Sequence, residues 1–231
     1  MSHLNKVFDI QRRAKLVLSR IADFIFEYST ERTIVKDCIN LLAEQGITET
    51  WYYDVPALAL LGSRSCLSIS GKDYQPADEF VGEINLITID LSPLDGNALG
   101  DCARSYVFES GKASQQSCSE PFLKGLKAEE ILHQDLIRFA APETTFEELF
   151  IHSNTLITDL GFENLDFLGN LGHSLVKDRS SRMFIEPGNR RKLDSVAYFT
   201  FEPHIKLKND KWGYKYEDIY YFDDNGLLNR L

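Results

Sequence analysis

The chain has 231 residues, of which 43% are hydrophobic and 26% are charged, and its formal net charge is −10. This composition is that of a globular protein, and the length suffices for one large domain or two small ones. The acidic balance argues against a nucleic-acid partner, which requires a basic face, and no stretch is apolar enough to predict a membrane partner.

Two amphipathic helices are predicted at the start of the chain. Between residues 4 and 28, apolar side chains recur at helical spacing, with Arg and Lys on the other side. Ser29 and Thr30 are typical residues for the start of a second helix, which Gly46 ends.

The next predicted segment is strand and loop. Residues 48–69 lose the helical period and are crowded with aromatic and aliphatic side chains, among them Trp51, Tyr52 and Tyr53. Residues 70–79 contain glycine and proline and predict a loop.

A hairpin is predicted between residues 83 and 109, and each of its arms carries an acid. The first arm is an apolar run that ends on Asp90, and the second arm begins with Asp101. A buried carboxylate without a partner costs on the order of several kcal/mol. A solvated strand end would explain either acid alone, whereas a metal centre would explain both.

A second pair of helices follows, and the chain then returns to strands. We expect one helix at about 120–140 and another that is capped by Thr144 or Thr145 and ends at Gly161. Residues 162–176 resemble irregular strand, and the last forty residues read as strands with a DDNG turn.

This order of two helices, strands, two helices and strands shows no repeat and no linker. It predicts one α+β domain over residues 1–231, with an antiparallel sheet covered by two pairs of helices.

Five residues in the predicted β segments are candidate metal ligands. Of the five histidines, His133 and His152 fall in helical patterns and are expected to be structural or surface residues, whereas His173 follows Gly172 beside an apolar strand. Glu202 and Glu217 are acids within apolar strands. With Asp90 and Asp101 they complete the candidate set.

A site rich in carboxylates with one imidazole suits divalent Mn, Fe, Co or Zn, and it can hold two ions if carboxylates bridge them. Two ions roughly 3.5–4 Å apart activate a shared water molecule.

The segments that hold these residues are ITIDLSP, GDCARSYVF, GHSL, FTFEPHI and YEDIYYFDDNG. In order and context they resemble the superfamily of methionine aminopeptidases, Xaa-Pro aminopeptidases and prolidases, peptidase family M24. The resemblance spans nearly the whole chain and implies the pita-bread fold and the catalytic domain only, without the N-terminal domain of many prolidases. It implies a hydrolase with two divalent ions, Mn²⁺ before Co, Fe or Zn, that cleaves a short peptide or small amide with a metal-bridging hydroxide.

The resemblance also implies a role for each ligand. Asp90 would chelate one ion, and Asp101 and Glu217 would bridge both. His173 and Glu202 would complete the second ion, and Glu202 would also handle the proton of the attacking water.

Three departures concern the groups around this set. No histidine lies between Leu4 and Leu132, where the family usually has one before the first Asp. Ser180 stands where a second histidine normally follows His173, and Lys215 stands where the family often has Arg. These losses leave open a metal enzyme with a non-peptide substrate or a peptide-binding pseudoenzyme.

Four residues are candidates for the substrate side. His204 shares a strand face with Glu202 at period 2, which makes it a candidate catalytic imidazole. Arg182, in a basic stretch that is otherwise a solvated loop, is a candidate for binding a substrate carboxylate. Tyr53 and Lys215 are further candidates for substrate binding.

The cysteines indicate a cellular location, and the family resemblance indicates an oligomeric state. The four cysteines, which form no CxxC pair, favour reduced thiols and a cytoplasmic location. The resemblance implies a possible homodimer.

Overall fold

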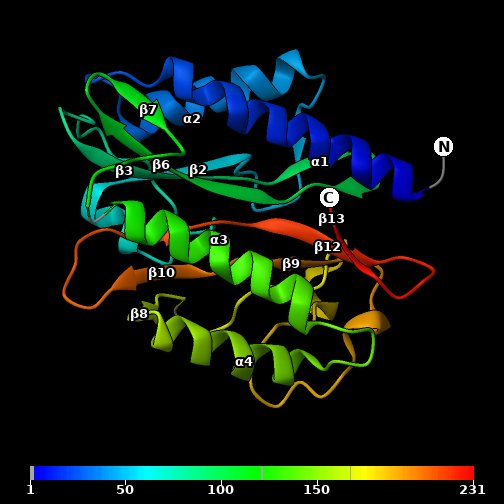
Figure 1. Cartoon of the computed structure of the whole chain (residues 1–231). Coiled ribbons are helices and arrows are strands. Elements are labelled where there is room, and N and C mark those ends of the chain that lie inside the picture. Colours follow the sequence, from blue (N-terminus) through cyan, green and yellow to red (C-terminus); the bar gives the residue numbers. More distant parts are fainter. Residues whose placement is uncertain (1–2, 121, 167) are drawn as a thin grey trace.

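The computed structural model describes residues 3–120, 122–166 and 168–231 (Figure 1). The α-helices of this described part come in two pairs: α1 (His3–Arg20), α2 (Glu31–Glu44), α3 (Phe122–Phe139) and α4 (Phe146–Asp159).

The strands are short, and all pairs between them are antiparallel. Those before α3 are β1 (Glu49–Thr50), β2 (Ala57–Leu61), β3 (Asn85–Leu91), β4 (Pro93–Asp95), β5 (Ala98–Leu99), β6 (Cys102–Glu109) and β7 (Lys112–Ser114). Those after α4 are β8 (Phe162–Asn164), β9 (Phe199–Phe201), β10 (His204–Leu207), β11 (Tyr214–Lys215), β12 (Asp218–Phe222) and β13 (Leu228–Arg230).

The first half of the molecule packs α1 and α2 on a sheet of order β2-β3-β6-β7 (Figure 1). A small sheet of order β1-β4-β5 extends it. The apolar faces of both helices and of the sheet form one hydrophobic core, which includes Ile10, Ile34 and Ile89. Thr30 caps α2 through a reciprocal pair of hydrogen bonds with Thr33, as its residue type predicts.

The second half packs α3 and α4 on two small sheets of order β11-β10-β8 and β13-β12-β9. Its separate core includes Leu132, Leu149 and Phe201. Gly125 lets α3 approach the ring of Tyr214, because an added Cβ there would lie 2.2 Å from a ring carbon.

The two halves meet along the start of β6. Glu217 N donates to Ala103 O at 3.0 Å, and Ala103 N donates to Glu217 O at 3.3 Å. Beside this bridge, the guanidinium of Arg104 contacts both oxygens of the buried Asp218 at 3.0 and 3.1 Å. These contacts join residues more than a hundred positions apart, and they bring the ends of several strands to one place.

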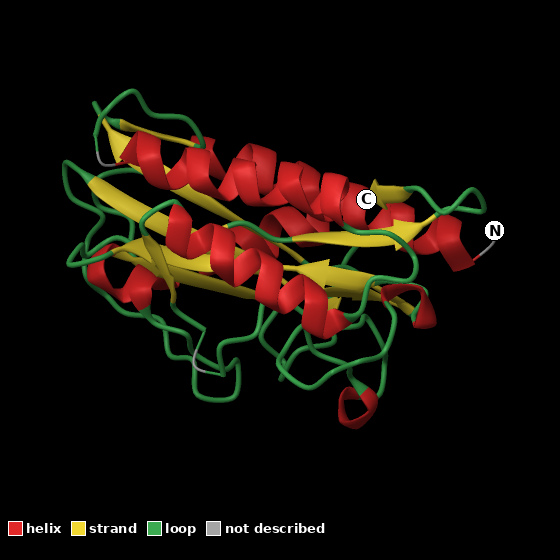
Figure 2. Cartoon of the chain, turned by 60° about the horizontal axis from the view of Figure 1, so that its bottom comes forward, coloured by secondary structure: helices red, strands yellow, loops and turns green. Residues whose placement is uncertain are grey.

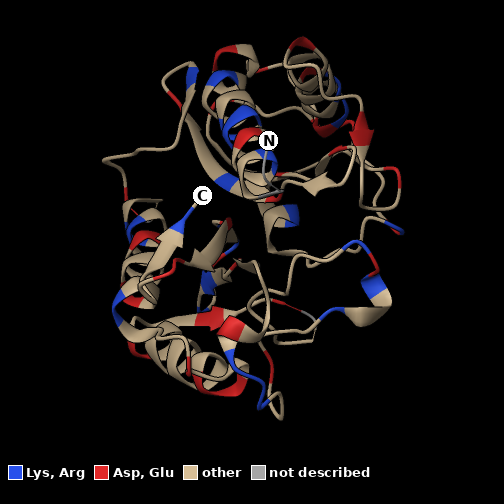
Figure 3. Ribbon diagram, turned by 90° about the vertical axis from the view of Figure 1, so that its right-hand side faces the viewer, with Lys and Arg blue, Asp and Glu red and all other residues tan. Residues whose placement is uncertain are grey.

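The predicted α+β class, the antiparallel pairing and the two helix pairs are confirmed. Figure 2 shows the long connecting loops gathered on one side of the strands, and Figure 3 shows acidic and basic residues interspersed along the outer helices. Within the described residues, the strands form four smaller sheets rather than the one continuous sheet that was expected.

Two predicted elements were wrong in extent. The helix expected over residues 4–28 ends at Arg20, because the Leu18 carbonyl accepts from Tyr106 Oη and the chain then passes through one 3-10 turn to Ile25. The irregular strand expected over 162–176 is limited to β8, and the rest is loop.

Candidate metal centre

Asp101, His173 and Glu217 form a buried cluster at the junction of the two halves. Asp101 precedes β6, His173 follows Gly172 in a loop, and Glu217 lies between β11 and β12. One ligand atom from each lies within 4.8 Å of the others. The three side chains come from distant parts of the chain, and the pairing of Ala103 with Glu217 brings two of them together.

The imidazole of His173 is oriented with one nitrogen toward the cluster. Its Nδ1 donates to the Ser174 carbonyl at 3.1 Å, which leaves the lone pair on Nε2. Nε2 lies 3.7 Å from Asp101 Oδ2 and 3.7 Å from Glu202 Oε1. Burial lowers the pKa of His173 to about 3, so the ring is neutral, as a metal ligand must be.

Gly172 sets the position of His173. Its φ is +140°, and an added Cβ would lie 2.2 Å from the Thr200 carbonyl oxygen. The close approach lets Thr200 N donate to the His173 carbonyl at 2.7 Å and Thr200 Oγ1 accept from His173 N at 3.1 Å. A residue with a side chain would push the loop away from β9.

Three carboxylate oxygens of the two acids in the cluster have no hydrogen-bond partner among the described residues. Asp101 Oδ2 and both carboxylate oxygens of Glu217 are buried without a hydrogen bond. Burial, followed by the nearby carboxylates, raises the pKa values of Asp101 and Glu217 well above the ordinary range. Buried oxygens and a neutral imidazole nitrogen that face one another are the donor set of a divalent cation, so these residues fit a metal ion.

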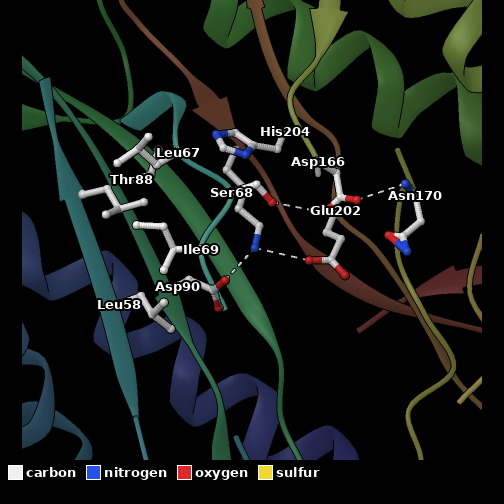
Figure 4. Close-up of a pocket in the computed structure, with 12 residues that line it drawn as sticks. Leu58, Leu67, Ser68, Ile69, Thr88, Asp90, Asp166, Asn170, Glu202 and His204 are labelled. Atoms are coloured by element: carbon white, nitrogen blue, oxygen red, sulfur yellow. Dashed lines mark hydrogen bonds and ion pairs between the residues drawn. The ribbon is translucent and has the colours of Figure 1, made fainter. Parts of the chain in front are cut away.

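The other two predicted ligands lie beside the cluster and contact a lysine. Lys215 Nζ lies 2.6 Å from Asp90 Oδ2, 3.2 Å from Glu202 Oε2 and 3.6 Å from Glu217 Oε2. In Figure 4, Asp90 and Glu202 face each other, and dashed lines mark the first two contacts. Burial alone would lower the pKa of Lys215, but the carboxylates around it raise it well above its usual value. The structure thus brings all five predicted ligands together and adds an ammonium group among them.

A cavity of about 330 Å³ opens onto the cluster. Trp51, Tyr53 and Arg182 line it, and the guanidinium of Arg182 lies 4.3 Å from the centre of the Trp51 ring. Nε and Nη2 of Arg182 are buried without a hydrogen-bond partner. Tyr53 and Arg182 were predicted from the sequence as substrate-binding residues, and both line this cavity together with Trp51 and Tyr52. Trp51, Tyr52 and Tyr53 form its aromatic wall.

The turn that presents the aromatic wall has an unusual backbone. Tyr53 and Asp54 have φ values of +49° and +59°, a region that residues with side chains seldom adopt. Arg179 lies over the Tyr53 ring at 3.8 Å. The turn holds the Tyr53 side chain at the mouth of the cavity, where the residue is 43% exposed.

His204 lines a cavity together with Glu202, with which it was predicted to share a strand face, and its ring is also hydrogen-bonded to the backbone. Its Nε2 donates to the Ser65 carbonyl at 2.6 Å. It lines a smaller cavity of about 70 Å³ together with Asp90, Glu202 and Lys215. Burial lowers its pKa to about 4. Its catalytic role stays a prediction.

His133 and His152, which lie on α3 and α4, are not part of the cluster. His133 is buried and bonded to Tyr220 Oη and the Tyr216 carbonyl, and His152 contacts Asp135 at 2.5 Å. The side chain of His3 lies outside the described residues.

Sequence reasoning missed Asp166 and Asn170, which line both cavities beside Glu202. Asp166 Oδ1 accepts from the backbone N of Leu168 and of Asn170 at 2.9 and 3.1 Å, and Ser68 Oγ donates to its Oδ2 at 3.3 Å. In the sequence, Asp166 is followed by Gly169 and Asn170, residue types that favour a turn. This signal indicates a turn but not proximity to a site.

Comparisons with known proteins were made for the sequence and for the structure. Residues 6–224 match the sequence profile of Metallopeptidase family M24. A search of curated protein sequences finds no match.

Many solved structures have a similar fold. The X-Pro aminopeptidase of Thermotoga maritima has a TM-score of 0.80 at 18% identity, over 99% of this chain and 60% of that chain. The prolidase of Thermococcus sibiricus has a TM-score of 0.76 at 18% identity, over 98% and 58%. A methionine aminopeptidase of Thermotoga maritima has a TM-score of 0.75 at 12% identity, over 96% and 93%.

The chain therefore spans about three fifths of the length of the first two relatives. Among the described residues, no helix is both long and apolar enough to cross a membrane.

Proposed function

The chain belongs to metallopeptidase family M24 and has the pita-bread fold, and from this premise we propose that it is a metal-dependent hydrolase of a short peptide or small amide. The observation that carries the proposal is the buried Asp101–His173–Glu217 cluster, in which three carboxylate oxygens have no hydrogen bond from the described residues. Buried carboxylates without a partner cost on the order of several kcal/mol, and a bound cation removes that cost.

We propose that Asp101, His173 and Glu217 hold a divalent ion. Mn²⁺ is the first candidate, with Co, Fe or Zn as alternatives, because the donor set is rich in carboxylate and has one imidazole. The second ion of the pair predicted from the sequence would require Asp90, whose carboxylate contacts Lys215.

The chain's own residues would then bind the substrate and transfer the proton. The ion, when bound, supplies a water molecule that is acidic enough to lose a proton near neutral pH. Glu202 borders the cluster and is the candidate base that takes this proton and passes it to the leaving nitrogen. His204 stays the second catalytic candidate, with Nδ1 as the nitrogen that its bond to Ser65 leaves available.

The cavity supports a substrate with a carboxylate. Arg182 has two buried N–H groups without an acceptor, and a guanidinium binds a carboxylate through two parallel hydrogen bonds. Tyr53 would form part of the wall. Because two of the similar structures are a prolidase and an X-Pro aminopeptidase, an X-Pro peptide is the first candidate substrate.

We also propose a single domain over residues 1–231 and a cytoplasmic location, which the four free cysteines support. The homodimer and the substrate-binding role of Lys215 stay predictions.

The test is turnover of a small peptide library, including X-Pro and Met-X peptides, by protein freed of metal and then given Mn²⁺ or Co²⁺. Asp101→Asn and Glu202→Gln are expected to lose at least 100-fold in rate, while Glu130→Gln on the exposed face of α3 keeps the rate. Activity that survives both site variants would refute the mechanism.

A second candidate is a protein that binds peptides without cleaving them. The position of Lys215 among the carboxylates favours it, because an ammonium already neutralises part of the cluster. Peptide binding by calorimetry, with no product in the same samples when Mn²⁺ is present, would select this function.

A further inference from the structure

The ammonium of Lys215 lies where the sequence predicts one of two metal ions. Its Nζ contacts Asp90 Oδ2 at 2.6 Å and Glu202 Oε2 at 3.2 Å and lies 3.6 Å from Glu217 Oε2. Asp90 and Glu217 are two of the three residues that the family resemblance implies for that ion. The third, Asp101, belongs to the cluster with His173.

We propose that this chain binds one divalent ion, at Asp101, His173 and Glu217, and that the Lys215 ammonium replaces the second ion. The inference rests on the proposed function only in taking the three-residue cluster as a metal site. It differs from the sequence prediction of two ions.

The ligand geometry leaves no place for both cations. A divalent ion on the Asp90 side would need carboxylate oxygens at about 2.0–2.2 Å. One oxygen of each of the two carboxylates that would supply these bonds, Asp90 Oδ2 and Glu217 Oε2, already faces Nζ. An ion there would meet the ammonium within the same small group of oxygens, and two cations at that separation repel strongly in a buried site.

The charges point the same way. Four carboxylates, from Asp90, Asp101, Glu202 and Glu217, surround the centre. One divalent ion and the lysine together leave a single net negative charge among these groups. A second divalent ion beside the lysine would make the sum positive. The other charged groups on the cavity wall, Asp166, Arg179 and Arg182, do not compensate for it, because together they carry one net positive charge.

The backbone holds Lys215 in this position. Ser105 Oγ donates to the Lys215 carbonyl at 3.0 Å and accepts from Lys215 N at 2.8 Å. Lys215 also pairs with His204 in the β10–β11 ladder. The side chain therefore starts from a fixed point, and only its rotamers can take the ammonium away from Asp90.

The experiment counts the ions. Protein freed of metal is titrated with Mn²⁺ by calorimetry, and the bound metal is measured by elemental analysis after gel filtration. We expect one ion per chain in the natural protein and two in Lys215→Met, which vacates the Asp90 side. Lys206→Met is the matched control. Lys206 lies on β10, the strand next to that of Lys215, and its ammonium contacts Glu163 at 3.0 Å instead of the cluster. The control variant should bind one ion.

Electron paramagnetic resonance gives an independent readout. The natural protein should show the spectrum of an isolated Mn²⁺, and Lys215→Met the spectrum of a magnetically coupled pair.

The outcomes separate the inference from the proposed function. Two ions in the natural protein would overturn the inference while leaving a metal-dependent hydrolase intact. One ion in both proteins would also overturn it, because the lysine would not be what excludes the second ion. No ion in the natural protein would refute the metal site itself, and with it the proposed function.

If Lys215→Met does not fold, Asp90→Asn tests the same inference. The amide oxygen still accepts from Lys215 but is a poor ligand for a divalent ion. We expect one ion with a Kd within about threefold of the natural value. A fall in the number of bound ions, or a 100-fold loss of affinity, would mean that Asp90 binds the metal.

Discussion

The side-chain amide of Gln11 makes two hydrogen bonds with the backbone of Asp101. Gln11 Nε2 donates to the Asp101 carbonyl at 2.7 Å, and Asp101 N donates to Gln11 Oε1 at 3.0 Å. Gln11 is fully buried on α1, so a helix from the start of the chain holds the residue that leads β6 into the cluster. The side chain of Asp101 is thereby left free to face His173 and Glu217.

Gln11→Leu is expected to lower both stability and metal affinity. The substitution leaves a buried N–H and a buried carbonyl without partners, which costs about 2–4 kcal/mol. A displaced ligand typically loses 10- to 100-fold in metal affinity. Urea unfolding and Mn²⁺ calorimetry measure the two effects. Gln134→Leu, whose amide contacts Glu130 on the surface of α3, is the control, and equal behaviour of both variants would contradict the role of Gln11.

Gly172→Ala is expected to destabilise the loop that holds His173. The φ of +140° and the approach of the Thr200 carbonyl together cost about 2–4 kcal/mol. Gly111→Ala is the matched control, because Gly111 has a φ of +76° but an added Cβ would meet nothing within 4 Å. Thermal unfolding and Mn²⁺ affinity should show a large loss for the first variant. The control should keep its affinity and lose about 1 kcal/mol of stability.

Asp218→Ala is expected to be the most destabilising of these changes. The fully buried carboxylate contacts Arg104 at 3.0 Å and Lys15 at 2.8 Å. Its removal takes the carboxylate from both cations and leaves Arg104 with two backbone carbonyls and Lys15 with Leu231 O as acceptors. Breaking such a buried pair costs about 3–5 kcal/mol.

Glu44→Ala, which breaks an exposed pair with Arg20, should cost less than about 1 kcal/mol. The measurement is the denaturant concentration at the unfolding midpoint, which should be lower for Asp218→Ala than for Glu44→Ala. If the midpoints were similar, the Asp218 contacts would not hold the two halves together.

Acid should destabilise the protein in part through His133. Burial lowers its pKa from 6.5 to about 3, against the opposing effect of Asp218 and in the same direction as Arg104 and Arg230. The unfolded chain therefore binds the proton more readily between pH 6.5 and 3. The contribution of neutral His133 to the free energy of unfolding is complete above pH 6.5. It is lost as the pH falls toward 3, by up to about 1.4 kcal/mol per pH unit.

His133→Gln removes the titrating group and should show a shallower loss of stability between pH 7 and pH 5. Urea unfolding of both proteins at each pH, in the presence of chelator, gives the change in unfolding free energy with pH for the natural protein and for the variant, and these two changes are compared. Parallel pH profiles would show that His133 is not the group responsible.

Metal should stabilise the folded chain, and its removal should reverse the effect. At Mn²⁺ about 100-fold above Kd, the gain in unfolding free energy is about 2.7 kcal/mol. Glu217→Gln should abolish the gain, because Glu217 contributes two of the buried oxygens that lack a hydrogen bond. The rise in Tm on adding Mn²⁺, with and without chelator, is the measurement. An equal rise in Glu217→Gln would place the ion elsewhere.

The sequence by itself determined the local elements and the kinds of residue at the centre. Helical periodicity and the capping residues Thr30 and Thr145 marked helices correctly, because caps and helical hydrogen bonds join residues three or four positions apart. The candidate ligands could be found because acids that interrupt apolar strands are conspicuous.

Only the tertiary structure decided which of these groups meet, and at what distance. The pairing of Ala103 with Glu217 and the hold of Gln11 on Asp101 join residues that no periodicity relates. The same holds for Lys215, whose ammonium contacts Asp90 although the two residues lie on different sheets. Strand spacing predicts which face a side chain shares along its own strand, but contacts between sheets depend on how the two cores pack.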